Sequence, residues 1–177
     1  MIKKWYVVFT KTNYEKKVAA GFAKNGIHHY LPLNCLSKTG VERKKVLLEP
    51  LFPNFVFVKL TEFEMEAAKR IRGVINFLYW IDTPAIINDV EIDIINSFIC
   101  EHPSVELVKS SVNKKEIIRI TSQYQSNEMP NSSVVQIKTI ILSLPSLGYN
   151  LIANVPQTKI ELIKPPHADF RGDKLTA

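Results

Sequence analysis

The first apolar positions of the chain change from a strand-like to a helical pattern. Residues 5–10 combine aromatic and β-branched side chains, a composition typical of a strand. Thr12 and Glu15 then match the capping box that begins a helix. The apolar residues that follow recur every four positions on one helical face: Tyr14, Val18 and Phe22. We therefore predict a strand and an amphipathic helix that ends at Gly26.

The next patterns predict a hairpin and a central strand. Residues 27–36 and 41–48 have strand composition and flank a polar turn at 37–40. Residues 54–60 carry apolar side chains on both faces of the predicted strand: the phenylalanines lie on one face and the valines on the other. A strand with two apolar faces is typical of the interior of a sheet.

Two further helices and a strand complete this pattern. Thr61 begins a short helix rich in Glu and Ala that Gly73 ends, and residues 74–80 form a strand. Asn88 opens a last helix, which Pro103 ends. Strands and helices then follow the order β-α-β-β-β-α-β-α. This order predicts an α+β fold in which helices flank an antiparallel, ferredoxin-like sheet.

The pattern of apolar and polar residues changes after the last predicted helix. Residues 104–114 are rich in serine and predict a linker. Short strand-like segments without helical period follow, which indicates a small β-barrel. They are residues 116–121, 134–144, 149–155 and 159–163. The predicted division is an N-terminal domain over 1–103, a linker over 104–114, a β-barrel over 115–164 and a flexible polar tail over 165–177.

Aromatic residues are more numerous on the predicted sheet than one covered face requires. Phe55 and Phe57 share one face of their strand, and Trp5, Val7 and Phe9 share a face of the first strand. A sheet with helices on one side needs only one apolar face. Either both faces are covered, or one is a docking surface for a partner.

Charge is distributed unevenly along the chain. The net charge is +6, but the first 60 residues carry 11 lysines and arginines against 3 acidic residues. Residues 61–103 carry 3 basic against 8 acidic residues. A basic first third indicates either a surface that faces nucleic acid or an ordinary solvated face.

Motifs for catalysis and metal binding are missing from the sequence. Cys35 and Cys100 lie far apart, and the histidines are scattered except for the pair His28 and His29, which would point to opposite faces of a strand. We expect reduced thiols, no cofactor, no metal site and no enzymatic activity. A pocket of converging carboxylates or histidines would revive an enzyme on a ferredoxin-like scaffold. With no long apolar run, we expect a cytoplasmic monomer without membrane contact.

Several segments resemble the N-terminal (NGN) domain of the NusG family of transcription elongation factors. The most specific is EPLFPNFVFV at 49–58, which resembles the family's PLFPxYxFV strand. Four weaker matches follow the same order as in the family: WYVV at 5–8, YLP at 30–32, RGV at 72–74 and PAII at 84–87. The resemblance spans about residues 5–100 and implies an NGN fold.

The second half resembles the KOW barrel of specialised NusG paralogues of the RfaH and UpxY type. Residues 147–151 and 155–156 match the end of that barrel. Residues 122–128 stand where KOW domains carry a glycine-rich turn, and they contain no glycine. The valine and isoleucine content of 134–155 favours strands over a helical hairpin.

The resemblance implies a set of binding residues. NGN domains dock an aromatic depression onto the clamp helices of the β′ subunit of bacterial RNA polymerase. By position, Phe9, Phe55 and Phe57 would line it, with Phe52 at its edge. The residues that would face upstream or non-template DNA are Lys11, Lys38, Arg43, Lys44 and Lys45. Arg72 would either help to read a DNA element or form a salt bridge.

The implied function is that of an elongation factor or antiterminator. The protein would stabilise the elongating state of the polymerase. The resemblance to the UpxY type implies that it acts at a polysaccharide operon. The C-terminal domain would recruit a ribosomal protein or a termination factor. The alternative is a ribosome- or RNA-binding KOW protein that does not act on polymerase. That alternative predicts that Phe55 and Phe57 are buried under helices.

Overall fold

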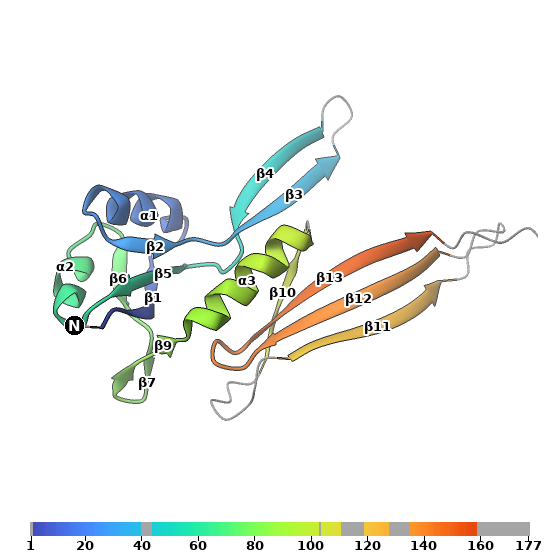
Figure 1. Cartoon of the computed structure of the whole chain (residues 1–177). Coiled ribbons are helices and arrows are strands. Elements are labelled where there is room, and N and C mark those ends of the chain that lie inside the picture. Colours follow the sequence, from blue (N-terminus) through green and yellow to red (C-terminus); the bar gives the residue numbers. More distant parts are fainter. Residues whose placement is uncertain (1, 40–43, 103, 111–118, 128–134, 159–177) are drawn as a thin grey trace, which may run out of the picture.

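The structure is a computed structural model of the chain. It describes residues 2–39, 44–102, 104–110, 119–127 and 135–158 (Figure 1).

A five-stranded antiparallel sheet forms the centre of the N-terminal part. Its order is β2-β5-β1-β6, and β9 pairs with β1 beside β6. The strands are β1 (Lys4–Thr10), β2 (His28–Tyr30), β5 (Phe55–Leu60), β6 (Val74–Phe77) and β9 (Ile86–Ile87). The predicted central position of β5 is confirmed, because β5 lies between β2 and β1 and five of its six residues are buried.

One face of this sheet lies under α1 (Glu15–Lys24), η1 (Glu62–Glu64) and α2 (Met65–Lys69). The valines of β5 and Phe22 of α1 share a buried cluster with Met65 and Ala68 of α2. A capping box joins Thr61 to Glu64 at the start of η1, as predicted. The box predicted for α1 is absent, because the Glu15 carboxylate instead accepts the backbone N–H of Asn54 at 2.8 Å.

The opposite face of the sheet lies under α3 (Asp89–Glu101) and a C-terminal sheet. This second sheet is antiparallel, with the order β10-β13-β12-β11. Its strands are β10 (Glu106–Lys109), β11 (Arg119–Asn127), β12 (Val135–Leu144) and β13 (Tyr149–Thr158). In Figure 1 the long strands run away from the N-terminal part, while the β12–β13 turn lies near the start of α3.

The C-terminal sheet differs from the sequence expectation in two places. β10 falls inside the predicted linker, where its backbone pairs with β13 from Glu106↔Ile152 to Lys109↔Tyr149. Residues 122–127, aligned with the glycine-rich KOW turn, belong to strand β11, which pairs without interruption with β12. The strand predicted at 159–163 lies outside the described residues, so the closed barrel and the domain boundaries stay predictions.

Two small hairpins complete the fold. β3 (Leu33–Thr39) pairs with β4 (Lys44–Pro50) and projects away from the body of the molecule (Figure 1). β7 (Tyr79–Trp80) pairs with β8 (Thr83–Pro84). The fold class is α+β, with helices flanking an antiparallel N-terminal sheet, as the sequence predicts.

Candidate functional site

The four phenylalanines predicted to bind polymerase form one cluster on the α3 side of the sheet. The ring centroids of Phe9 and Phe55 lie 4.9 Å apart, and those of Phe52 and Phe57 lie 5.6 Å apart, both edge to face. The pairing of β1 with β5 sets Phe9 opposite Phe55. We call these four residues the aromatic face. The structure thus brings the four predicted residues together, whereas their binding role stays a prediction.

The aromatic face is covered by the C-terminal sheet. Phe52, Phe55 and Phe57 are only 1%, 6% and 0% exposed, and Phe9 is half-buried. The ring of Tyr149, at the start of β13, stands 5.7 Å from Phe52 and 6.1 Å from Phe55. The other C-terminal residues buried in the same cluster are Leu142, Leu144, Leu147, Leu151 and Ala153. The second apolar face of the sheet is thus covered by a segment distant in sequence.

Helix α3 contributes to the same cover. Ile92, Ile95 and Phe98 belong to the cluster that contains the aromatic face. The RNA-binding alternative predicted burial of Phe55 and Phe57 under helices, whereas here a helix and a sheet share the cover. Burial of these rings therefore does not by itself separate the two functional hypotheses.

Two sets of polar contacts, one buried and one part-buried, fasten the C-terminal segment to the N-terminal part. The side chain of Asn34, on β3, donates to the carbonyl of Val105 at 2.6 Å and accepts the Val105 N–H at 3.0 Å. The Ser146 hydroxyl, in the β12–β13 turn, donates to the carboxyl group of Glu91 on α3. Burial raises the pKa of this carboxyl group, and the Ser146 hydrogen bond opposes that shift.

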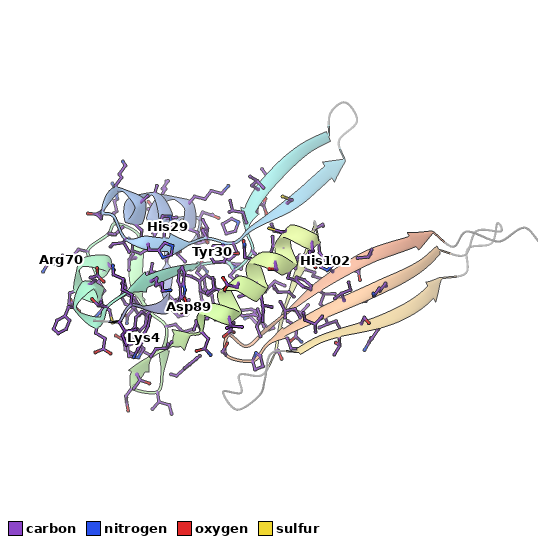
Figure 2. All side chains as sticks on the ribbon, viewed as in Figure 1. Lys4, His29, Tyr30, Arg70, Asp89 and His102 are labelled. Atoms are coloured by element: carbon purple, nitrogen blue, oxygen red, sulfur yellow. The ribbon has the colours of Figure 1, made fainter. Side chains whose placement is uncertain are left out.

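A basic cleft of about 790 Å³ lies between α1 and α2, on the side of the sheet opposite the aromatic face. The residues that line it are Tyr14, Lys17, Gly21, Asn25, Ala67, Arg70, Ile71 and Arg72. Three of them are exposed cations, and none is acidic. The ammonium group of Lys17 lies 4.6 Å from the centroid of the Tyr14 ring. We call this the α1–α2 cleft; Figure 2 shows Arg70 beside α2, at the edge of the molecule.

Arg72 lines the α1–α2 cleft, and no ion pair among the described residues includes it. The ion pairs within the described residues involve Lys3, Lys59 and Lys69. Lys11 is exposed, and its backbone N–H donates to the carbonyl of Gly73 at 2.9 Å, which places Lys11 beside the segment that carries Arg72. The structure therefore brings these two predicted residues together.

The other predicted cations belong to the projecting hairpin. Lys38 lies on β3, and Lys44 and Lys45 lie on β4, with Lys38 paired to Lys45 in the backbone register. Their side chains and the whole of Arg43 lie outside the described part of the chain. Their proposed contact with DNA stays a prediction.

Sequence reasoning missed three residues of the α1–α2 cleft: Tyr14, Lys17 and Arg70. Tyr14 was assigned only to the apolar helical face. The available signal was the Arg70-Ile71-Arg72 spacing beside Gly73. Gly73 has a φ of +104°, and a Cβ there would lie 2.7 Å from Cδ1 of Tyr14, so the glycine lets the loop pack against the ring.

A comparison with known families matches residues 3–96 to the model described as "Transcription termination factor nusG". This match covers more than half of the 177 residues. The chain belongs to the NusG family. A comparison with curated proteins gave no match. Among solved structures, NusG of Thermotoga maritima, described under "Domain interaction in Thermotoga maritima NusG", is 19% identical with a TM-score of 0.43, and the match covers 83% of this chain and 96% of that one.

Membership of the NusG family sets the broad function. Proteins of this family are transcription factors that interact with RNA polymerase and are not enzymes, so the role of this chain is in transcription elongation. Within the described ranges, no group of three potential metal ligands comes together. None of the helices in the part of the chain that the structure describes is long and apolar enough to cross a membrane.

Proposed function

We propose that this NusG-family factor binds the clamp helices of the polymerase β′ subunit through its aromatic face and promotes processive elongation. The observation that carries the proposal is the composition of that face. It is built from the family-specific EPLFPNFVFV segment together with Phe9, and its rings gather on one side of the sheet. Buried aromatic anchors are the usual source of affinity at protein interfaces.

Docking in this way requires the C-terminal sheet to leave the aromatic face. With Phe52, Phe55 and Phe57 at most 6% exposed, a partner has no access to their rings in the closed arrangement. The factor would therefore exist in a closed state and an open state, and polymerase would bind only the open one. Its apparent affinity is then reduced by the fraction of molecules that are open.

The α1–α2 cleft is a second binding surface in this proposal. Exposed lysine and arginine side chains bind phosphates with little sequence preference, and an aromatic ring beside them offers a stacking surface for a base. Lys11, Lys17, Arg70 and Arg72 would contact upstream or non-template DNA here, with the cations of the β3–β4 hairpin as further contacts. Because the cleft and the aromatic face lie on opposite sides of the sheet, both could be occupied together.

Two finer parts of the proposal rest on the resemblance to specialised paralogues. The factor would act as an antiterminator on selected operons, such as one for polysaccharide biosynthesis. The C-terminal segment, once released, would be available to a ribosomal protein or a termination factor. In place of the glycine-rich turn of KOW domains, that partner would meet the strand β11.

Binding of purified core RNA polymerase tests the proposal, and Tyr149 is the residue to change. Phe55 and Phe57 are core residues, so their loss would cost about 3–5 kcal/mol each and would confuse unfolding with lost binding. Tyr149→Ala instead weakens the cover from the C-terminal side and leaves the aromatic face intact. We expect this variant to bind polymerase more tightly than wild type.

The matched control is Tyr149→Phe, which keeps both ring contacts and should bind like wild type. Wild type and Tyr149→Ala without polymerase affinity at micromolar concentration would refute the polymerase assignment. A parallel measurement with structured RNA would then decide whether the RNA-binding alternative takes its place.

A further inference from the structure

Glu91 is a buried acid at the contact between α3 and the C-terminal sheet. It is only 2% exposed, although it lies in the first turn of α3. Its carboxyl group accepts a hydrogen bond from Ser146, the hydroxyl-bearing residue of the β12–β13 turn. The same turn leads directly into Tyr149, whose ring covers Phe52 and Phe55. Glu91 thus sits where the closed state is fastened.

The described neighbours of Glu91 offer its carboxyl group no ion pair. On α3, the Asp93 side chain is exposed. The Asp89 carboxylate pairs with the Lys59 ammonium group of β5 and accepts a hydrogen bond from Nε1 of Trp5 on β1 at 2.9 Å. Figure 2 places Asp89 at the beginning of α3. From the opposing side, residues 145–148 are Pro-Ser-Leu-Gly and bring no ionisable group. Among the described ion pairs, none includes Glu91.

We propose that Glu91 and Ser146 form a protonation-sensitive latch that holds the C-terminal sheet on the aromatic face when the carboxyl group is neutral and releases it when the group ionises. The inference deepens the proposed function, because it assigns a control to the closure that would hide the polymerase-binding face. It concerns the closure itself, so it can be tested in the absence of polymerase.

The physical reason is the cost of burying a charge. In the open state water solvates the carboxylate, whereas in the closed state one hydroxyl donor replaces that water. The dipole of a helix favours a negative charge near its first turn, but this stabilisation is small compared with the free energy needed to desolvate a carboxylate. The neutral carboxyl group needs only the hydrogen bond that Ser146 supplies, so it is the form that fits the closed state.

The direction of the pH dependence follows from the raised pKa of Glu91 in the closed state. Closure is most stable below the ordinary carboxyl pKa of 4.5, where both states are protonated. As pH rises above that value, the open state ionises first and closure weakens. Above the raised pKa that Glu91 has in the closed state, its contribution to the stability of closure is fully lost and no longer changes with pH. At neutral pH, Glu91 therefore favours opening, relative to a neutral side chain of the same shape.

Amide hydrogen exchange of the full chain measures this opening. The Val105 N–H is held by Asn34 at the junction of the two parts and reports release of the C-terminal segment, whereas the Val58 N–H of β5 reports global unfolding. The exchange rates of wild type and Glu91→Gln are compared at each pH, so that the intrinsic pH dependence of exchange cancels in their ratio.

We expect Val105 to exchange faster in wild type than in Glu91→Gln at pH 7, by about tenfold for each pKa unit by which closure raises the carboxyl pKa. At pH 4 the ratio should approach one, and Val58 should not follow the change. Ser146→Ala should accelerate exchange at pH 7. Asp93→Asn, an exposed acid of the same helix, should behave like wild type.

Three results would overturn the latch. They are a wild-type to Glu91→Gln ratio that is one or less at pH 7, a ratio that does not change with pH, and an equal change in the Val58 amide. A failure of polymerase binding with the expected exchange ratios would reject the proposed function and leave the latch standing.

Discussion

Single residues of this protein show which local patterns determine structure and which depend on distant partners. The alternation of phenylalanine and valine in β5 was readable from the sequence, because neighbouring residues of a strand point to opposite faces. The capping box predicted from Thr12 and Glu15 was wrong, because the Glu15 carboxylate accepts the Asn54 N–H, far away in sequence. Local geometry was predictable, whereas the choice between two hydrogen-bond partners needed the fold.

Gly73 provides a prediction at this scale. Alanine there would adopt a φ of +104° and place its Cβ 2.7 Å from Tyr14, so Gly73→Ala should lower the free energy of unfolding by about 1–3 kcal/mol. Gly26 is the matched control, because it also has a positive φ, of +66°, but a Cβ there meets nothing within 4 Å. Urea denaturation of both variants measures the difference, and equal losses would contradict the role assigned to the Tyr14 contact.

Elements were predicted better than the contacts between them. The helices and the main strands of the N-terminal part occur in the predicted order, because each has its own periodicity. The strands predicted at 27–36 and 74–80 each divide in two, however, and β8 and β9 were not predicted. The short strand β10 was assigned to a linker, since four residues of mixed polarity carry no strand signal until β13 pairs with them. The α1–α2 cleft was missed for a similar reason. Lys17 lies on α1, whereas Arg70 and Arg72 lie in the segment after α2, and the sequence does not show that these two parts approach each other.

The cleft provides a prediction at the scale of elements. Arg70→Ala and Arg72→Ala should each weaken binding of single-stranded DNA and lower the salt slope of that binding by about 0.7, because each removes a phosphate contact. Titration of a fluorescent oligonucleotide at several salt concentrations measures both quantities. Lys3→Ala is the control, since Lys3 is an exposed cation paired with Glu64 outside the cleft. An unchanged salt slope in both arginine variants would remove the cleft from the nucleic-acid surface.

At the scale of the whole molecule, the closed arrangement is the feature that the sequence did not predict. The surplus of aromatic residues on the sheet was evident, and two explanations were open: a second covered face, or a docking surface. The structure shows the face covered, and it is covered by residues such as Leu142, Tyr149 and Leu151, which lie far from β1 and β5 in the sequence. Apolar alternation in a strand does not specify which distant surface it meets.

A covered face can still be a docking surface if the cover moves. The cover here combines apolar packing with the Asn34–Val105 and Glu91–Ser146 contacts. The second contact buries an acid that has no ion-pair partner among the described residues. The apolar packing favours the closed arrangement, whereas ionisation of the buried Glu91 carboxyl group would disfavour it. In this account, the balance between closing and opening determines how much of the factor is ready to bind polymerase.

The ratio of polymerase affinities between Tyr149→Ala and wild type tests this account most directly. The variant loses two edge-to-face contacts, each contributing about 0.5–1.5 kcal/mol to closure, so its open fraction should rise. We expect Tyr149→Ala to bind core polymerase at least about fivefold more tightly than wild type, and Tyr149→Phe to bind like wild type. Equal or weaker binding by a folded Tyr149→Ala protein would contradict it, because the aromatic face would then not be the surface that polymerase meets.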